Sequence, residues 1–167
     1  LFSLYSQYSA GIGELTDLIF MIDWCKAGGM SIIQLLPMND VGFDFRPYDA
    51  QSTFALEPMY LSLQGLKAVK MSAFKAKLDK LKEKFPAGGE RVDYGIKQAK
   101  LELLWEVFEH HRDLADSGWV KDFNRYLEEN KFWLEDYAWF KVIKEKNNQS
   151  GWEAWEDKLR HRDKKAL

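Results

Sequence analysis

Residues 31–63 read SIIQLLPMNDVGFDFRPYDAQSTFALEPMYLSL, and this stretch decides the fold that the sequence predicts. It opens with a short apolar run within 32–36 that is β-branched at its start and stopped by Pro37. Such a run is typical of a strand buried on both faces, and these strands belong mainly to parallel α/β sheets. A helical pattern precedes the run, so we expect a β/α unit whose strand is followed by a long polar loop.

That loop carries the best candidates for a binding site. Its charged and aromatic residues include Asp40, Asp44, Arg46, Tyr48 and Asp49. In α/β barrels the loops after the carboxyl ends of the strands build the active site. Planar rings can stack on sugars, and charged groups can bond to hydroxyls. Pro47 should hold Tyr48 as a stiff stacking platform, although the pattern alone suits an ordinary loop tyrosine equally well.

Short motifs follow one another in a fixed order along the chain. They are GIGE at 11–14, DL at 17–18, DW at 23–24, QLLPMND at 34–40, PY at 47–48, FAL at 54–56, PMYL at 58–61, RVDY at 91–94 and WLEDYA at 133–138. This series resembles the amylomaltase or disproportionating-enzyme family, the 4-α-glucanotransferases. The resemblance covers nearly the whole chain and is thin between residues 65 and 90.

The resemblance implies an α/β fold, namely a partial (β/α) TIM-barrel start with a large, mainly helical insertion or subdomain. We expect the first β/α units and the substrate-side loop in residues 1–64, and the helical part in residues 65–167. Because a full barrel needs about 250 residues, we expect this chain to be a fragment, cut at its C-terminus.

The activity implied is the transfer of α-1,4-glucan chains between maltooligosaccharides by a retaining double displacement. In this family the catalytic carboxylates lie on loops after later barrel strands. We therefore assign no catalytic residue here, and we expect the segment alone to be inactive. Two other functions stay open: a non-catalytic glucan-binding or helical interaction module, and an α-amylase-like hydrolase.

The resemblance also suggests which residues meet the glucan. Tyr48 comes first, because the family's Pro-Tyr tyrosine lines the subsite next to the scissile bond. The remaining candidates are Pro47, Asp49, Asn39, Asp40 and Ser52. Asn39 and Asp40 would brace the loop by Asx-type bonds at least as readily as they would contact sugar.

The chain departs from the family pattern at two places in this loop. Serine is usual where Arg46 stands, and serine or asparagine is frequent where Asp49 stands. An ion pair from Arg46 to Asp49 or Asp44 would explain both changes, and we expect such a pair to be structural.

Outside the loop the periodicity predicts a mainly helical chain. We expect helices over 14–27, 66–85, 93–112, 117–129 and 131–146, a helical piece from residue 152, and a second strand over 59–63. Asp93 and Ser117 are expected N-caps, and Asn130 an expected helix end. The helix over 131–146 is aromatic nearly all round, which predicts burial between layers.

Composition bounds the partners. The net charge is −2, from 24 basic and 26 acidic residues, and there is no long run of like charges, so we expect no nucleic acid and no membrane partner. Cys25 is the only cysteine, which suits a cytoplasmic location. We expect no cofactor and no metal, since His110 and His111 are adjacent and point in different directions on a helix. We interpret most of the seven tryptophans as core, and we expect exposed barrel edges to favour self-association.

Overall fold

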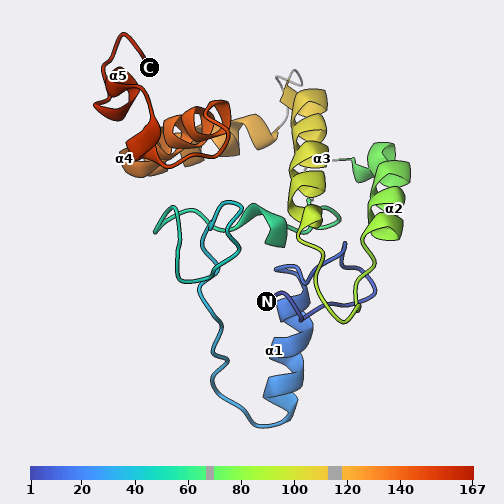
Figure 1. Cartoon of the computed structure of the whole chain (residues 1–167). Helices are drawn as coiled ribbons and strands as arrows, with labels where there is room; N and C mark the ends of the chain where they lie inside the picture. The colour runs from blue at the N-terminus through green and yellow to red at the C-terminus, as the bar shows by residue number, and fades with distance from the viewer. Residues whose placement is uncertain (67–69, 113–117) are drawn as a thin grey trace. The chain divides into compact units, whose positions relative to one another are not determined.

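The computed structural model describes residues 1–66, 70–112 and 118–167 (Figure 1). The chain forms two compact units, Leu1–Ala115 and Asp116–Leu167. The predicted division after residue 64 stays a prediction.

The first unit is built from short helices joined by long loops. Its elements are α1 (Asp17–Ala27), η1 (Pro58–Tyr60), η2 (Met71–Phe74), α2 (Lys75–Lys84) and α3 (Gly95–Arg112). Helix α3 contacts both α2 and the short η1 turn (Figure 1). The core that they share consists of Ala10, Ile12, Met59, Tyr60, Leu63, Phe74, Leu78, Leu81, Phe85, Ile96, Leu103 and Val107. The loops are thus held against α3 by one hydrophobic cluster.

Local signals explain where the helices begin and end. Asp17 lies in the first turn of α1 and Lys26 in its last turn, as the helix dipole favours. Gly28 and Gly29 end α1, and Gly29 has a φ of 73°, which glycine adopts without strain. The predicted N-cap of α3 is confirmed, since the Asp93 carboxylate accepts the Gly95 N–H at 2.9 Å.

The two predicted strands do not form in the described residues. Residues 31–38 are irregular, and Ile32 is 85% exposed. The second predicted strand, 59–63, instead begins within the 3₁₀ turn η1. A strand requires a neighbouring strand that shares its hydrogen bonds. In the described ranges, residues 31–38 have no such neighbour, and the only bridge nearby is the isolated antiparallel one between Asn39 and Leu56. The barrel start therefore stays a prediction.

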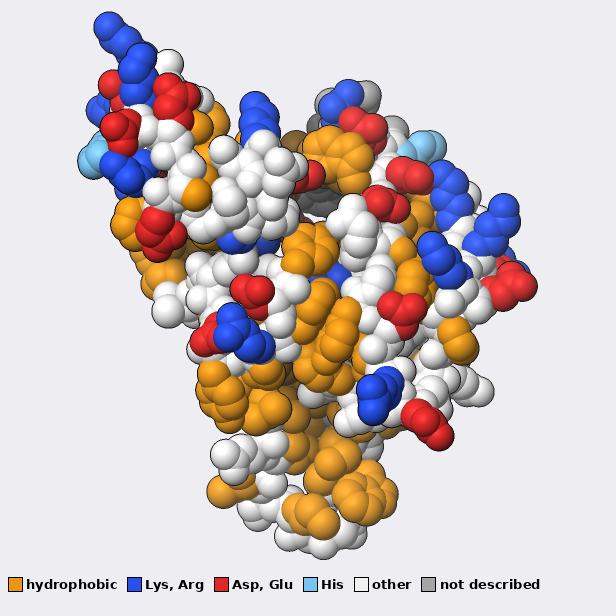
Figure 2. Space-filling model, viewed as in Figure 1, with side chains coloured by type: hydrophobic (Ala, Val, Ile, Leu, Met, Phe, Trp, Pro, Cys, Tyr) orange, Lys and Arg blue, Asp and Glu red, His pale blue; other side chains and the backbone are white. Residues whose placement is uncertain are grey.

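The apolar spacing of the sequence predicts one buried stripe in each of two helices, and both predictions are wrong in part. The predicted stripes are Leu15, Leu18, Ile19, Ile22 and Cys25 in the helix over 14–27, and Leu101, Leu104, Trp105 and Phe108 in the helix over 93–112. In α1 only Asp17 and Cys25 are buried, whereas Ile19 and Ile22 are exposed. In α3 the buried side is rotated from the predicted one, so that Trp105 and Phe108 are exposed. Figure 2 shows hydrophobic side chains open on the surface beside charged ones.

The second unit contains α4 (Gly118–Lys146), η3 (Trp152–Ala154) and α5 (Asp157–Arg160). The predicted break at Asn130 is wrong, because α4 runs through it without interruption. The Asn130 amide bonds within the helix, donating to the Tyr126 carbonyl at 2.9 Å and accepting from the Trp133 indole at 3.0 Å. The predicted cap Ser117 lies outside the described residues.

Most of α4 is not enclosed in the described structure. Ile143 is buried, but Phe132 is 73% exposed, so the predicted burial of this segment between layers is wrong here. Among the described helices, none combines the length and the apolar character needed to cross a membrane.

Candidate functional site

The loop predicted from the sequence exists and is closed at its base by backbone hydrogen bonds. The Asp40 N–H donates to the Ala55 carbonyl at 2.9 Å, and the Asp40 carbonyl accepts the Gln51 N–H at 2.7 Å. One residue pair further out, the Glu57 N–H donates to the Met38 carbonyl at 2.8 Å. We call residues 40–51 the 40–51 loop.

The tip of this loop is a tight turn that presents Tyr48. The Asp49 N–H donates to the Arg46 carbonyl at 3.0 Å, which places Pro47 and Tyr48 at the two central positions of the turn. Proline suits the first central position because its φ is already set. The Tyr48 ring is 77% exposed. The tip therefore offers a planar, accessible ring on a constrained backbone.

The expected ion pair of Arg46 is confirmed, and its partner is Asp49. The guanidinium and carboxylate are 3.0 Å apart across the turn. Both side chains are largely exposed, so the pair contributes about 0–1 kcal/mol and orders the turn only weakly.

Three of the other candidates brace the loop. The Asn39 amide donates to the Thr53 carbonyl at 3.0 Å, and Asp40 accepts the Gly42 N–H at 2.8 Å. The Ser52 hydroxyl accepts the Phe54 and Ala55 N–H groups at 3.1 and 3.0 Å. The Asx-type bond predicted for Asp40 is confirmed, whereas Asn39 braces the loop by a long-range bond to the Thr53 carbonyl and not by the predicted Asx-type bond. Contact of any candidate with a sugar stays a prediction.

Beneath the loop lies a buried lysine that the sequence reasoning missed. The Lys97 ammonium on α3 is 2.7 Å from Glu57 Oε2 and 3.2 Å from Asp40 Oδ1, and it donates to the Gly42 carbonyl. All three side chains are essentially buried. A buried ion pair of this kind must be well hydrogen-bonded, because both charges have lost their water.

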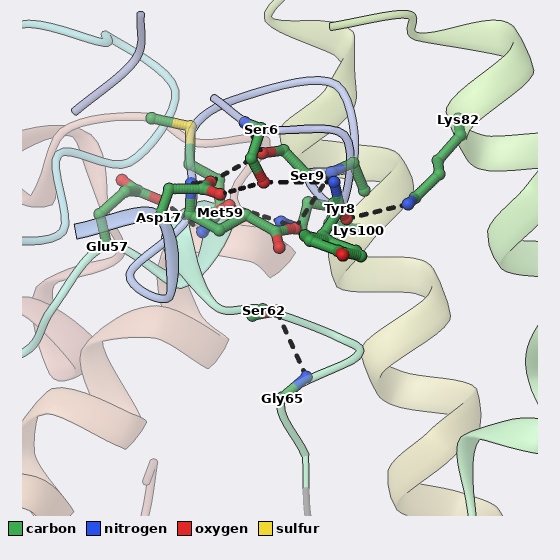
Figure 3. A network of polar contacts seen from close by, with 12 residues as sticks. Ser6, Tyr8, Ser9, Asp17, Glu57, Met59, Ser62, Gly65, Lys82 and Lys100 are labelled. Carbon is green, nitrogen blue, oxygen red and sulfur yellow. Dashed lines mark hydrogen bonds and ion pairs between the residues drawn. The ribbon is translucent and has the colours of Figure 1, made fainter. Parts of the chain in front are cut away.

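A second buried lysine lies one turn further along α3. The Lys100 ammonium is 2.7 Å from Glu14 Oε1 and donates to the Met59 carbonyl at 2.8 Å (Figure 3). Burial lowers the pKa of Lys100, and the neighbouring Glu14 carboxylate opposes that shift. Burial likewise raises the pKa of Glu57, against the effect of its hydrogen bond from Lys97.

Next to this pair, Asp17 organises the N-terminal loop. Its carboxylate accepts the Ser6 hydroxyl at 2.6 Å, the Ser9 hydroxyl at 2.7 Å and the Glu14 N–H at 2.7 Å. Figure 3 shows Ser6 and Ser9 turned toward Asp17. One buried carboxylate at the start of α1 thus fixes the segment 6–14.

A periodicity signal for one of the two lysines, Lys100, was present in the sequence. Ile96, Lys100, Leu103 and Val107 follow the i, i+4, i+7, i+11 spacing of one helix face. Because lysine is almost never fully buried unless it is paired, the sequence pattern predicted that the purely apolar face of this helix would be the buried one. The acidic partners lie too far away in sequence to be recognised beforehand.

Tryptophans gather in the second unit around a separate hollow. Trp139, Trp152 and Trp155 line a pocket of about 240 Å³, which the ion pair of Arg162 with Asp136 borders. Trp155 is buried, and its indole N–H has no hydrogen-bond partner among the described residues. Trp152 and Trp139 are exposed, as are Trp24 and Trp105 in the first unit, so the interpretation of most tryptophans as core is wrong for these four.

The described residues contain no cluster of three or more His, Cys, Asp or Glu side chains that could hold a metal ion. His111 is buried, and one ring nitrogen lies 2.8 Å from the Val107 carbonyl. The arrangement thus offers an exposed ring on a braced loop, supported by buried ion pairs.

Comparison with known proteins agrees with the motif series. The sequence model of the 4-alpha-glucanotransferase family matches residues 1–167. The chain is 41% identical over 150 residues to a 4-alpha-glucanotransferase of Chlamydia caviae, covering 86% of this chain and 27% of that protein. It is 33% identical over 167 residues to that of Synechocystis, covering 99% of this chain and 32% of that protein. It is 31% identical over 161 residues to 4-alpha-glucanotransferase DPE2 of Oryza sativa subsp. japonica, covering 93% of this chain and 17% of that protein. The chain therefore spans about a third or less of the length of these relatives.

Proposed function

Because the chain belongs to the 4-alpha-glucanotransferase family, we propose that it supplies one wall of the glucan site in an enzyme that moves α-1,4-glucan chains between maltooligosaccharides. The observation that carries this proposal is the exposed Tyr48 ring at the tip of the 40–51 loop. A flat, accessible ring beside hydrogen-bonding groups suits the apolar face and hydroxyl rim of a glucose unit.

The proposed reaction is a retaining double displacement. A carboxylate attacks the anomeric carbon and forms a glycosyl-enzyme, while a carboxylic acid about 5–5.5 Å away protonates the departing sugar oxygen. In the second step the same acid, now a carboxylate, takes a proton from the 4-hydroxyl of an acceptor sugar, which attacks the anomeric carbon and frees the nucleophile. No water is consumed, and one glycosidic bond replaces another.

The catalytic carboxylates are proposed to lie outside this chain. In support, the buried carboxylates of the described residues are already engaged. Glu14, Asp40 and Glu57 pair with lysines, and Asp17 accepts three hydrogen bonds from its neighbours. A carboxylate held in this way is not free to attack a sugar.

The proposed architecture is the start of a (β/α) barrel, with the helical part as an insertion or subdomain. The order of α1, an apolar segment free of helix at 31–36 and then a polar loop is that of a barrel unit. The exposed apolar side chains of α1 and of that segment also support self-association of this chain. A cytoplasmic location remains part of the proposal.

Calorimetric titration with maltoheptaose tests the proposed site. We expect the chain to bind maltoheptaose and Tyr48→Ala to raise the Kd about tenfold. A tenfold change in Kd corresponds to about 1.4 kcal/mol, which is the size of one aromatic contact. Tyr126→Ala, an exposed tyrosine on α4, is the matched control and should bind as the unmodified chain does. Equal affinities of all three proteins would refute the role of Tyr48.

Incubation with maltotriose tests the division of labour. We expect no glucose from the isolated chain, because the reacting carboxylates are absent from it. Glucose release by the chain would overturn that part of the proposal. Release of glucose without formation of longer oligosaccharides would indicate hydrolysis rather than transfer.

A further inference from the structure

We infer that Lys97 is a positioning residue, which holds the 40–51 loop from α3 so that the Tyr48 ring is presented to an α-glucan. This inference rests on the proposed function, since it takes the Tyr48 ring as the surface that meets the sugar. It assigns to the helical part of the chain a role in setting the shape of the glucan site.

The contacts of Lys97 are concentrated at the base of the loop. Its ammonium bonds to the side chain of Asp40, the carbonyl of Gly42 and the side chain of Glu57. An ammonium has three donors, and these three acceptors use all of them. Asp40 in turn carries both backbone bonds that close the loop, to Ala55 and to Gln51. Lys97 therefore anchors the residue on which loop closure depends.

Aromatic contacts extend the anchor toward the tip. The Lys97 ammonium lies 5.2 Å from the ring centre of Phe43 and 5.8 Å from that of Phe45, which is cation–π range. Phe45 also stacks on Tyr94, just before α3, with ring centres 4.2 Å apart. Phe45 has a φ of 56°, an uncommon value for a bulky residue that persists only when surrounding contacts impose it. The turn with Tyr48 begins at the next residue.

The same helix contains a matched control. Lys100 is as buried as Lys97 and is also paired with a carboxylate, but its partners are Glu14 and the Met59 carbonyl. None of these partners belongs to the 40–51 loop. Methionine is similar in length to lysine but has no charge, so either substitution removes one buried ammonium. Only Lys97→Met also removes an anchor of the loop.

The experiment compares Lys97→Met and Lys100→Met in the full chain. Amide hydrogen exchange, followed residue by residue by NMR, reports on the loop through the Gly42 and Gln51 N–H groups. For Lys97→Met we expect exchange at these two amides to accelerate at least about tenfold more than for Lys100→Met, because local opening no longer breaks an ion pair. We also expect the affinity for maltoheptaose to fall about tenfold in Lys97→Met but not in Lys100→Met. A tenfold fall is what the loss of one aromatic contact would cause.

Every outcome either supports or overturns the inference that Lys97 positions the 40–51 loop. Equal acceleration in the two variants would overturn the inference, because it would make Lys97 merely one more core residue. Faster exchange with unchanged affinity would also overturn it, because the loop would be loosened without consequence for the sugar. If the unmodified chain fails to bind maltoheptaose, the proposed glucan contact fails, while the exchange comparison still judges the anchoring. Should Lys97→Met not fold, Asp40→Asn, which weakens the same ion pair but keeps an acceptor for Gly42, is measured in its place with the same expected direction.

Discussion

Replacing Asp17 should destabilise the first unit in a graded way that its hydrogen bonds determine. The Asp17 carboxylate is 2% exposed and accepts two serine hydroxyls and one backbone N–H. Asp17→Ala removes every one of these acceptors. Ser6 is partly exposed and can turn to water, but Ser9 and the Glu14 N–H are buried and would stay unpaired.

The magnitude follows from those two orphaned donors. A buried donor without a partner costs about 1–3 kcal/mol, so Asp17→Ala should lower the free energy of unfolding by about 4 kcal/mol. Asp17→Asn should cost only about 1 kcal/mol, because its carbonyl oxygen can still accept from Ser9 and Glu14 while its NH₂ donates to Ser6.

Urea unfolding followed by circular dichroism measures these differences. The control is Asp23→Ala, an exposed position on the same helix, which should change stability by less than about 0.5 kcal/mol. The reasoning is refuted if the Ala and Asn variants at Asp17 lose the same free energy, or if Asp17→Ala costs no more than the control.

Two further changes probe the core of the same unit. Gly13→Ala would drive a Cβ into the carbonyl oxygens of Leu1 and Leu4, so we expect it to cost about 3 kcal/mol in urea unfolding, whereas Gly89→Ala meets no atom closer than 3.5 Å and should be neutral. Burial raises the pKa of Tyr60 in the folded chain, whereas in the unfolded chain the phenol has a pKa of about 10. The stability that Tyr60 contributes is therefore complete below about pH 10. Above that pH the unfolded chain ionises first, and the free energy of unfolding falls by about 1.4 kcal/mol per pH unit. Tyr60→Phe should remove that part of the alkaline decline when unfolding is measured between about pH 9 and 11, and equal slopes for the two proteins would contradict the assignment.

Features that depend on neighbours in sequence were predicted well. The cap of α3 at Asp93, the end of α1 at Gly28 and the turn at Pro47 and Tyr48 all form as expected. Each uses hydrogen bonds between residues two to four positions apart, so the residue types alone carry the information. The comparisons also confirm the family resemblance, which was recognised from short motifs in a fixed order along the chain.

Features that depend on distant partners were not predicted. The segment at 31–36 has the composition of a buried strand, but a strand forms only where another segment supplies the opposing hydrogen bonds. Asn130 is a local signal that was predicted wrongly: its residue type suits a helix end, but its amide bonds to Tyr126 and Trp133, four and three positions away, inside α4.

The sequence by itself determined the family, the helical character of the chain and the proline turn that carries Tyr48, whereas the exposure of Tyr48 is seen only in the structure. Only the tertiary structure decided that Lys97 and Lys100 lie inside, since their partners Glu57 and Glu14 are 40 and 86 residues away. The physical reason is that an ammonium leaves water only when a carboxylate is already placed to receive it, and that placement is a property of the folded chain as a whole.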